Sequence, residues 1–342
     1  MKLRSLSCAA LALAFAGCCL TSLAQTNPPA GLPQHSQMPA APPPQHPAAH
    51  LPSAPTAPME PKFPPVSPAN FTAAAPTKAE VDAFLHASWG YDPNRVWEVY
   101  AIEKTPAPGL SKVTILVAEK PNPRIQPLSI LVTPDGHHLI TQNLQMIDFG
   151  PHPYEANYRV LQQRADGPSL GAPGKQFLLV EFADFECPHC RAAQPLVKEL
   201  IQDFPQAHYV FEMFPLVSIH PMAFQAAAFG ACVDQQGGNA DFFKYGDAIF
   251  AAQAELDGKE GGQALRNAVT PTGLDPEKIA ACADSPAAKS AVDASMRLGQ
   301  DLRVDETPTL FIDGRGVSMM EIPYEVLKKI IAWQFSMDKA AQ

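Results

Sequence analysis

The chain has 342 residues, enough for about two domains, and its formal net charge is −9 at pH 7. This acidic balance argues against nucleic-acid binding, which requires a basic surface. It leaves enzymatic function open.

The first residues have the pattern of an export signal. Lys2 and Arg4 precede an apolar run over residues 6–20, which is short for a membrane span. We therefore predict a signal peptide over residues 1–24 and a periplasmic or other extracytoplasmic location. The alternative is a lipid anchor on Cys18, because the residues before it resemble a lipoprotein box.

Residues 25–75 are predicted to be a disordered linker. Between Asn27 and Pro68 there are 15 prolines and few large apolar side chains. Such a segment cannot bury a core, and proline favours extended backbone.

Residues 76–160 are predicted to form a small α+β domain. Thr77 and Glu80 have the spacing of a capping box at a helix start. Runs rich in β-branched and aromatic residues follow, and Pro134-Asp135-Gly136 is a turn signal between the last two. We expect one helix and a four-stranded antiparallel sheet. The four runs are 96–102, 112–118, 127–133 and 138–146.

Residues 168–340 are predicted to form an α/β domain. The nearly continuous apolar run at 177–183 is typical of a strand buried on both faces. Cys187-Pro188-His189-Cys190 follows, and apolar residues then repeat at helical spacing up to Phe204. Cys187 is therefore expected at a strand-to-helix turn.

The remainder of this domain is predicted to contain an inserted helical subdomain at about 221–303, where the sequence is alanine-rich and helical in period. Residues 208–215 and 309–313 are strand candidates on either side of it. Pro323 opens a final helix.

The spacing of Cys187 and Cys190 suits thiol–disulfide chemistry. A thiol at a helix N-terminus faces unpaired N–H groups, which favour the reactive thiolate. We assign Cys187 as the attacking thiolate and Cys190 as the resolving thiol. His189 can add a donor or a positive charge and stabilise the reduced form.

Two further cysteines, Cys232 and Cys282, follow the signal segment. We predict a structural disulfide between them that holds the helical insertion. Two alternatives remain open: a zinc site made by all four cysteines, and a pair of buried free thiols. We predict no metal and no cofactor.

The run from Val180 to Cys190, with Thr307-Pro308-Thr309 downstream and a helical insertion between them, resembles the DsbA-like branch of the thioredoxin superfamily. The resemblance implies a thioredoxin-like fold over 168–340 and a cis Pro308 packed against the active disulfide. It also implies that the Thr307 backbone binds extended substrate chains. Glu181 matches a family acid that helps proton transfer at Cys190, the alternative being an edge-facing charge.

The order of elements in residues 76–160 is similar to that of the dimerisation domains of DsbC-like isomerases. This similarity implies a homodimer. His220-Pro221 could approach the cysteines, although a capped helix start explains it as well.

The predicted function is an exported thiol:disulfide oxidoreductase that introduces disulfides into exported proteins. The alternative is a DsbC-like isomerase or reductase, and a third hypothesis is a non-enzymatic chaperone or scaffold. The expected partners are unfolded or misfolded exported polypeptides and a DsbB-like or DsbD-like membrane redox partner.

Overall fold

The computed structural model describes residues 60–122, 124–140 and 146–340. The predicted signal peptide, the Cys18 alternative and most of the predicted linker lie outside these residues. Within the described part of the chain, none of the helices has both the length and the apolar character needed to cross a membrane.

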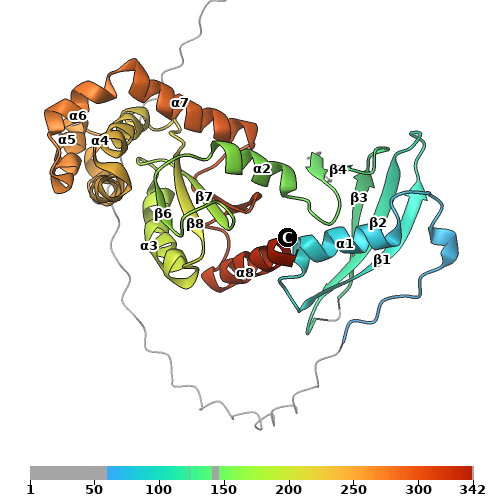
Figure 1. Ribbon diagram of the computed structural model, residues 1–342. Helices are drawn as coiled ribbons and strands as arrows, with labels where there is room; N and C mark the ends of the chain where they lie inside the picture. The colour runs from blue at the N-terminus through green and yellow to red at the C-terminus, as the bar shows by residue number, and fades with distance from the viewer. Residues whose placement is uncertain (1–59, 123, 141–145, 341–342) are drawn as a thin grey trace, which may run out of the picture. The chain divides into compact units, whose positions relative to one another are not determined.

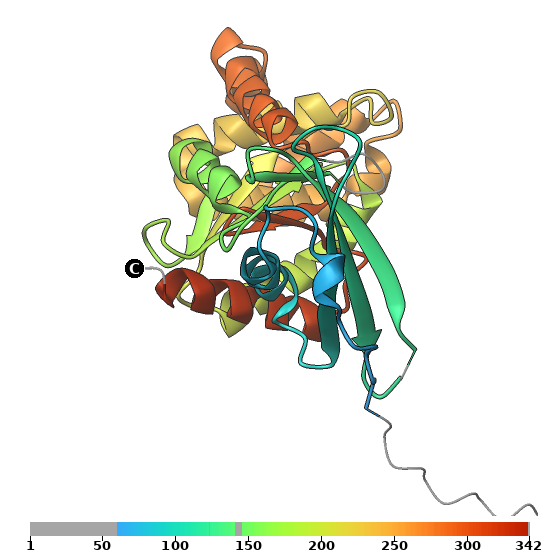
Figure 2. The same cartoon turned by 90° about the vertical axis from the view of Figure 1, so that its right-hand side faces the viewer.

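An antiparallel sheet and one α-helix form the N-terminal part of the described chain (Figures 1 and 2). The capping box is present, since Thr77 Oγ1 accepts from the Glu80 N–H at 3.2 Å and Glu80 Oε2 accepts from the Thr77 N–H at 2.7 Å. Val81 and Leu85 bury the helix against the sheet. The elements are η1 Pro68–Asn70, α1 Lys78–Trp89, β1 Arg95–Lys104, β2 Ser111–Glu119, β3 Gln126–Val132, β4 His138–Ile140 and β5 Met146–Asp148.

This sheet has five described strands in the order β1-β2-β3-β4-β5, so the prediction of four was wrong. The run predicted as one strand at 138–146 contains β4 and the start of β5, which pair antiparallel with His138 opposite Asp148. The two strands therefore run in opposite directions, although the sequence pattern suggested one strand. The turn at Pro134-Asp135-Gly136 is confirmed, because the Gly136 N–H donates to the Thr133 carbonyl at 3.0 Å.

A second, mixed sheet has the order β10-β9-β7-β8-β6. Its central pair, β7 and β8, is parallel, while β6, β9 and β10 each pair antiparallel with their neighbours. All six residues of β7 are buried, as the apolar run predicts. The strands are β6 Ser169–Gly171, β7 Leu178–Ala183, β8 His208–Met213, β9 Thr309–Ile312 and β10 Arg315–Ser318.

Helices cover both faces of this sheet (Figure 1). Because side chains alternate along a strand, Leu178, Val180 and Phe182 face α2 and α7, whereas Leu179 and Ala183 face α3 and α8. These helices are α2 Glu155–Arg164, α3 Pro188–Asp203, α7 Pro286–Asp301 and α8 Tyr324–Ala340.

The sequence-based prediction also lacked α2, β6 and β10. Residue 160, the predicted end of the first domain, lies inside α2, and Leu161 of that helix packs into the core of the mixed sheet. The helix was missed because few of its residues are apolar. At β10, Gly314 and Gly316 are typical of a turn and weaken the strand pattern.

The helical insertion consists of α4 Ala223–Ala251, η2 Gln253–Glu255, α5 Gly261–Val269, η3 Thr270–Thr272, α6 Pro276–Ala283 and α7. Gly238 interrupts α4 with φ of +75°, in the left-handed region that favours glycine. Phe185, just before the cysteine tetrad, has ring contacts with Phe242 and Tyr245 of α4. The insertion therefore packs directly on the segment that carries the cysteines.

A disulfide joins Cys232 of α4 to Cys282 of α6, with the Cα atoms 6.0 Å apart. The structure thus contains this pair rather than a zinc site or two free thiols at these positions. The bond closes a loop with a sequence separation of 50 and links α4 to α6 within the insertion.

Replacing both Cys232 and Cys282 by serine is expected to lower the free energy of unfolding by about 4 kcal/mol, because the unfolded chain regains the entropy of an open loop. Urea unfolding measures the loss. Both compared proteins carry Cys187→Ser and Cys190→Ser, so that no thiol exchange occurs. Equal unfolding midpoints for the two proteins would contradict the prediction.

Candidate active site

Cys187 lies where β7 passes into α3. It is the residue that precedes the first helical position, which Pro188 occupies. The short loop between them is held by the Cys187 N–H, which donates to the Asp184 carbonyl at 3.1 Å. The Cys187 sulfur therefore lies at the helix end whose N–H groups have no partner within the helix.

The two thiols of the tetrad have opposite acidities. A hydrogen bond from Cys190, a contact with Thr307 and the backbone N–H groups of Cys190 and His189 lower the pKa of Cys187 to about 5, although burial opposes them. Burial raises the pKa of Cys190 well above its ordinary value. Cys187 keeps 4% of its surface exposed and Cys190 keeps none. The cysteine that retains some exposed surface is thus the one that ionises readily.

Thr307 and Pro308 come from the far end of the chain, just before β9, and Thr307 contacts Cys187. The peptide bond between them is cis. Cys187 Sγ lies 3.5 Å from the Thr307 carbonyl oxygen. The structure therefore brings together the two motifs that the sequence separates by 120 residues.

Glu181 of β7 is fully buried rather than edge-facing. Burial raises its pKa to about 7, while hydrogen bonds from Tyr209 and Gln194 act in the opposite direction. The negative charge of Glu181 also contributes to raising the pKa of Cys190. A carboxyl group with this acidity can take up or release a proton near neutral pH.

Pro188 and His189 are exposed on the first turn of α3. His189 acts on Cys187 through its backbone N–H, which helps to lower the pKa of that thiol. This contribution differs from the side-chain donor or charge that the sequence suggested.

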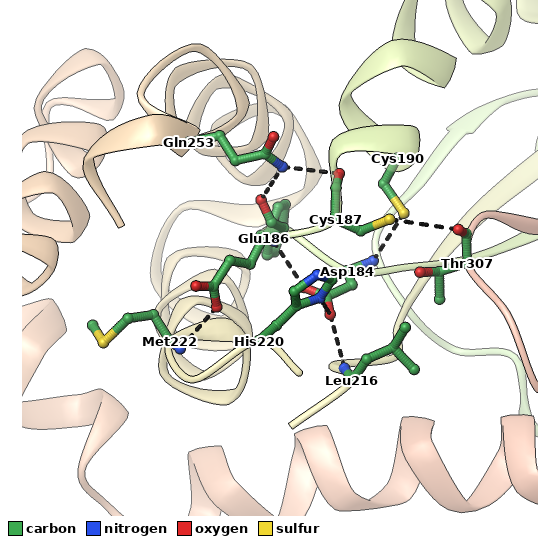
Figure 3. A network of polar contacts seen from close by, with 10 residues as sticks. Asp184, Glu186, Cys187, Cys190, Leu216, His220, Met222, Gln253 and Thr307 are labelled. Carbon is green, nitrogen blue, oxygen red and sulfur yellow. Dashed lines mark hydrogen bonds and ion pairs between the residues drawn. The ribbon is translucent and has the colours of Figure 1, made fainter. Parts of the chain in front are cut away.

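A second polar network surrounds the tetrad and was not predicted (Figure 3). Asp184 Oδ2 lies 2.8 Å from His220 Nδ1, and Glu186 Oε2 accepts from the Met222 N–H at 2.8 Å. Gln253 donates to the carbonyl oxygens of Phe185 and Cys187, each at 2.9 Å. His220 had been considered from sequence alone. Asp184 and Glu186 lie in the run from Val180 to Cys190. Nothing in the spacing of this run indicates that they would pair with His220 and Met222.

A protein-family model described as thioredoxin matches residues 164–332. Together with the mixed sheet and the helical insertion, this match confirms the predicted thioredoxin-like fold class.

Among curated proteins, "Na(+)/H(+) antiporter NhaA 3" of Salinispora tropica is 41% identical over 78 residues, which are 23% of this chain and 12% of that protein. "Na(+)/H(+) antiporter NhaA 1" of Mycobacterium sp. strain KMS is 32% identical over 152 residues, 42% of this chain and 23% of that protein. The chain therefore spans less than a quarter of the length of these relatives.

Similar solved structures include the catalytic domain of Proteus mirabilis ScsC, with a TM-score of 0.45, 18% identity, and coverage of 53% of this chain and 96% of that chain. A thioredoxin-like oxidoreductase from Silicibacter pomeroyi has a TM-score of 0.44 and 24% identity, covering 51% and 94%. Oxidised BdbD from Bacillus subtilis has a TM-score of 0.44 and 19% identity, covering 50% and 93%.

Replacing Glu181 by glutamine is expected to stabilise the protein at pH 8 by up to about 3 kcal/mol. In wild type the unfolded state releases the Glu181 proton near pH 4.5 and the folded state near 7, so stability falls as pH rises between these values. Glutamine carries no charge and removes that decrease. Urea unfolding of both proteins at pH 4 and pH 8 measures the difference.

Glu212→Gln is the matched control. Burial also raises the pKa of Glu212, but this carboxylate accepts from Ser295 of α7 and from the Gly167 N–H, on the other face of the sheet. Both substitutions should change the pH dependence of stability, and only Glu181→Gln should slow thiol exchange. An exchange rate unaffected by Glu181→Gln would contradict a proton-transfer role for this carboxyl group.

Proposed function

We propose that this chain, in which residues 164–332 form a thioredoxin-like domain, is a thiol–disulfide oxidoreductase acting through Cys187 and Cys190. The observation that carries the proposal is the pair of neighbouring thiols with opposite acidity at the start of α3. A purely structural pair would need neither a stabilised thiolate nor a buried carboxyl group beside the second thiol.

The exchange proceeds through a mixed disulfide. In the oxidising direction a substrate thiolate attacks Cys187 Sγ, the Cys187–Cys190 bond breaks, and Cys190 leaves as a thiolate that takes up a proton. A second substrate thiolate then attacks the substrate sulfur bonded to Cys187. The substrate gains a disulfide and the protein becomes a dithiol. In the reducing direction every step reverses.

The acidity of Cys187 favours the oxidising direction. A thiol with a pKa near 5 is ionised at neutral pH, which stabilises the reduced protein and makes the disulfide a stronger oxidant. The second candidate is a DsbC-like isomerase or reductase, suggested by the helix and antiparallel sheet of the N-terminal part. If the chain is such an isomerase or reductase, we also expect it to form a homodimer.

Export, location and partners belong to the same proposal. The substrates are unfolded or misfolded exported polypeptides, reached outside the cytoplasm through the predicted signal peptide. An oxidase requires a DsbB-like membrane partner to restore the disulfide, and an isomerase or reductase requires a DsbD-like partner to keep the thiols reduced.

The reduction potential of the Cys187–Cys190 pair separates these candidates. We expect a value toward about −120 mV, as for a strong dithiol oxidant, because the Cys187 thiolate stabilises the reduced state. Equilibration with glutathione buffers, followed by counting of free thiols, measures it, with Cys187→Ala as the control. A value near about −270 mV would favour the reductase. A wild-type protein without an exchangeable pair would overturn the enzymatic proposal.

A further inference from the structure

Asp184 contacts both redox cysteines through its backbone. Its N–H donates to Cys190 Sγ at 3.4 Å, and its carbonyl oxygen accepts from the Cys187 N–H at 3.1 Å. The position of the Asp184 backbone therefore determines whether its N–H can donate to the buried sulfur of Cys190. Such a bond favours the thiolate form of Cys190, against the burial that disfavours it.

The Asp184 side chain is fixed by three nitrogen atoms. Oδ1 accepts from the Glu186 N–H at 2.8 Å, and Oδ2 accepts from the Leu216 N–H at 2.8 Å and lies 2.8 Å from His220 Nδ1 (Figure 3). An ionised carboxylate only accepts, so Nδ1 of His220 carries the hydrogen. The Asp184 side chain has no exposed surface. A buried carboxylate in this position requires its donors.

His220 connects this carboxylate to the start of the helical insertion. Its own N–H donates to the Leu216 carbonyl at 2.9 Å, and its carbonyl accepts from the Ala223 N–H, at the first residue of α4, at 3.3 Å. The imidazole therefore joins the segment after β8 to the segment after β7. Loss of the contact between His220 and Asp184 removes one of the hydrogen bonds that hold the Asp184 loop in place.

We propose that the Asp184–His220 pair positions the Asp184 peptide N–H against Cys190 Sγ and thereby stabilises Cys190 as a thiolate during exchange. Asp184 and His220 are positioning residues, since they act through the backbone of the loop. The inference rests on the proposed thiol–disulfide exchange. It states which step of that exchange depends on the Asp184–His220 pair.

That step is the resolution of the mixed disulfide. Cys190 gives its proton to a base, and its thiolate attacks Cys187 Sγ. The new Cys187–Cys190 bond forms, the bond from Cys187 to the second sulfur breaks, and the released thiolate takes up a proton. In the reverse direction Cys190 is the leaving thiolate. Both directions therefore pass through the species that the Asp184 N–H stabilises.

Reaction of the reduced protein with oxidised glutathione separates the two steps. Attack by Cys187 forms the glutathione mixed disulfide, and attack by Cys190 then releases reduced glutathione. Acid quenching and mass spectrometry give one rate constant for each step. Asp184→Asn and His220→Leu are expected to slow the Cys190 step about tenfold and change the Cys187 step by no more than about twofold.

Two further variants separate positioning from general loss of structure. His220→Asn keeps a donor at the position of Nδ1 and should restore the Cys190 step to within about threefold of wild type. His208→Leu removes another histidine, whose Nδ1 lies 2.8 Å from the Ala172 carbonyl at the opposite end of β8, and should leave both steps unchanged.

The inference is overturned if Asp184→Asn and His220→Leu resolve the mixed disulfide at the wild-type rate. It is also overturned if both steps slow equally, or if His220→Asn does not restore the second step. A wild-type protein that never forms the mixed disulfide would instead overturn the proposed function on which the inference rests.

Discussion

The stabilisation of one sulfur anion, Cys187, is the interaction on which the site depends. The sulfur lies at the beginning of α3, where Cys190 and two backbone N–H groups point toward it. The surrounding fold serves this arrangement: β7 delivers the loop, the segment before β9 brings Thr307, and Gln253 of the insertion holds the carbonyl oxygens around the tetrad. Burial of the same sulfur acts against the charge, so these donors are necessary.

Two buried carboxyl groups near the tetrad have different environments and therefore different tasks. Glu181 lies within the sheet, where burial outweighs its hydrogen bonds and brings its pKa to about 7. Asp184, three residues later, meets donors from Glu186, Leu216 and His220. The first is suited to exchanging a proton and the second to anchoring a loop. Both carboxyl groups are buried, so the difference between them lies in their hydrogen-bond donors: two for Glu181 and three for Asp184.

Much of the site could be predicted from sequence because its central residues are local. The apolar run of β7, the tetrad and the helical period of α3 are contiguous, so periodicity alone locates Cys187 at a strand-to-helix turn. Glu181 and Thr307 required a family resemblance, because nothing local indicates that a strand carboxyl group or a distant Thr-Pro reaches the sulfur. The backbone N–H of His189 also lowers the pKa of Cys187, and this contribution was not foreseen from the sequence.

The remaining features depend on contacts between distant segments. Asp184 and His220 are 36 residues apart, and their pairing arises only when β8 aligns beside β7. The helix α2 was missed because it buries little besides Leu161, and β10 because glycines obscured a short edge strand. β4 and β5 were not separated because the β-forming run contains β4 and continues to the first residue of β5.

The most direct measurement is a pH titration of the reduced protein, following the ultraviolet absorbance of the Cys187 thiolate, with Cys187→Ala as the blank. We expect a transition centred near pH 5 that disappears in the variant. A midpoint near about 8.5, the value of an unperturbed cysteine, would contradict it, because the donors at the start of α3 would then not stabilise the anion.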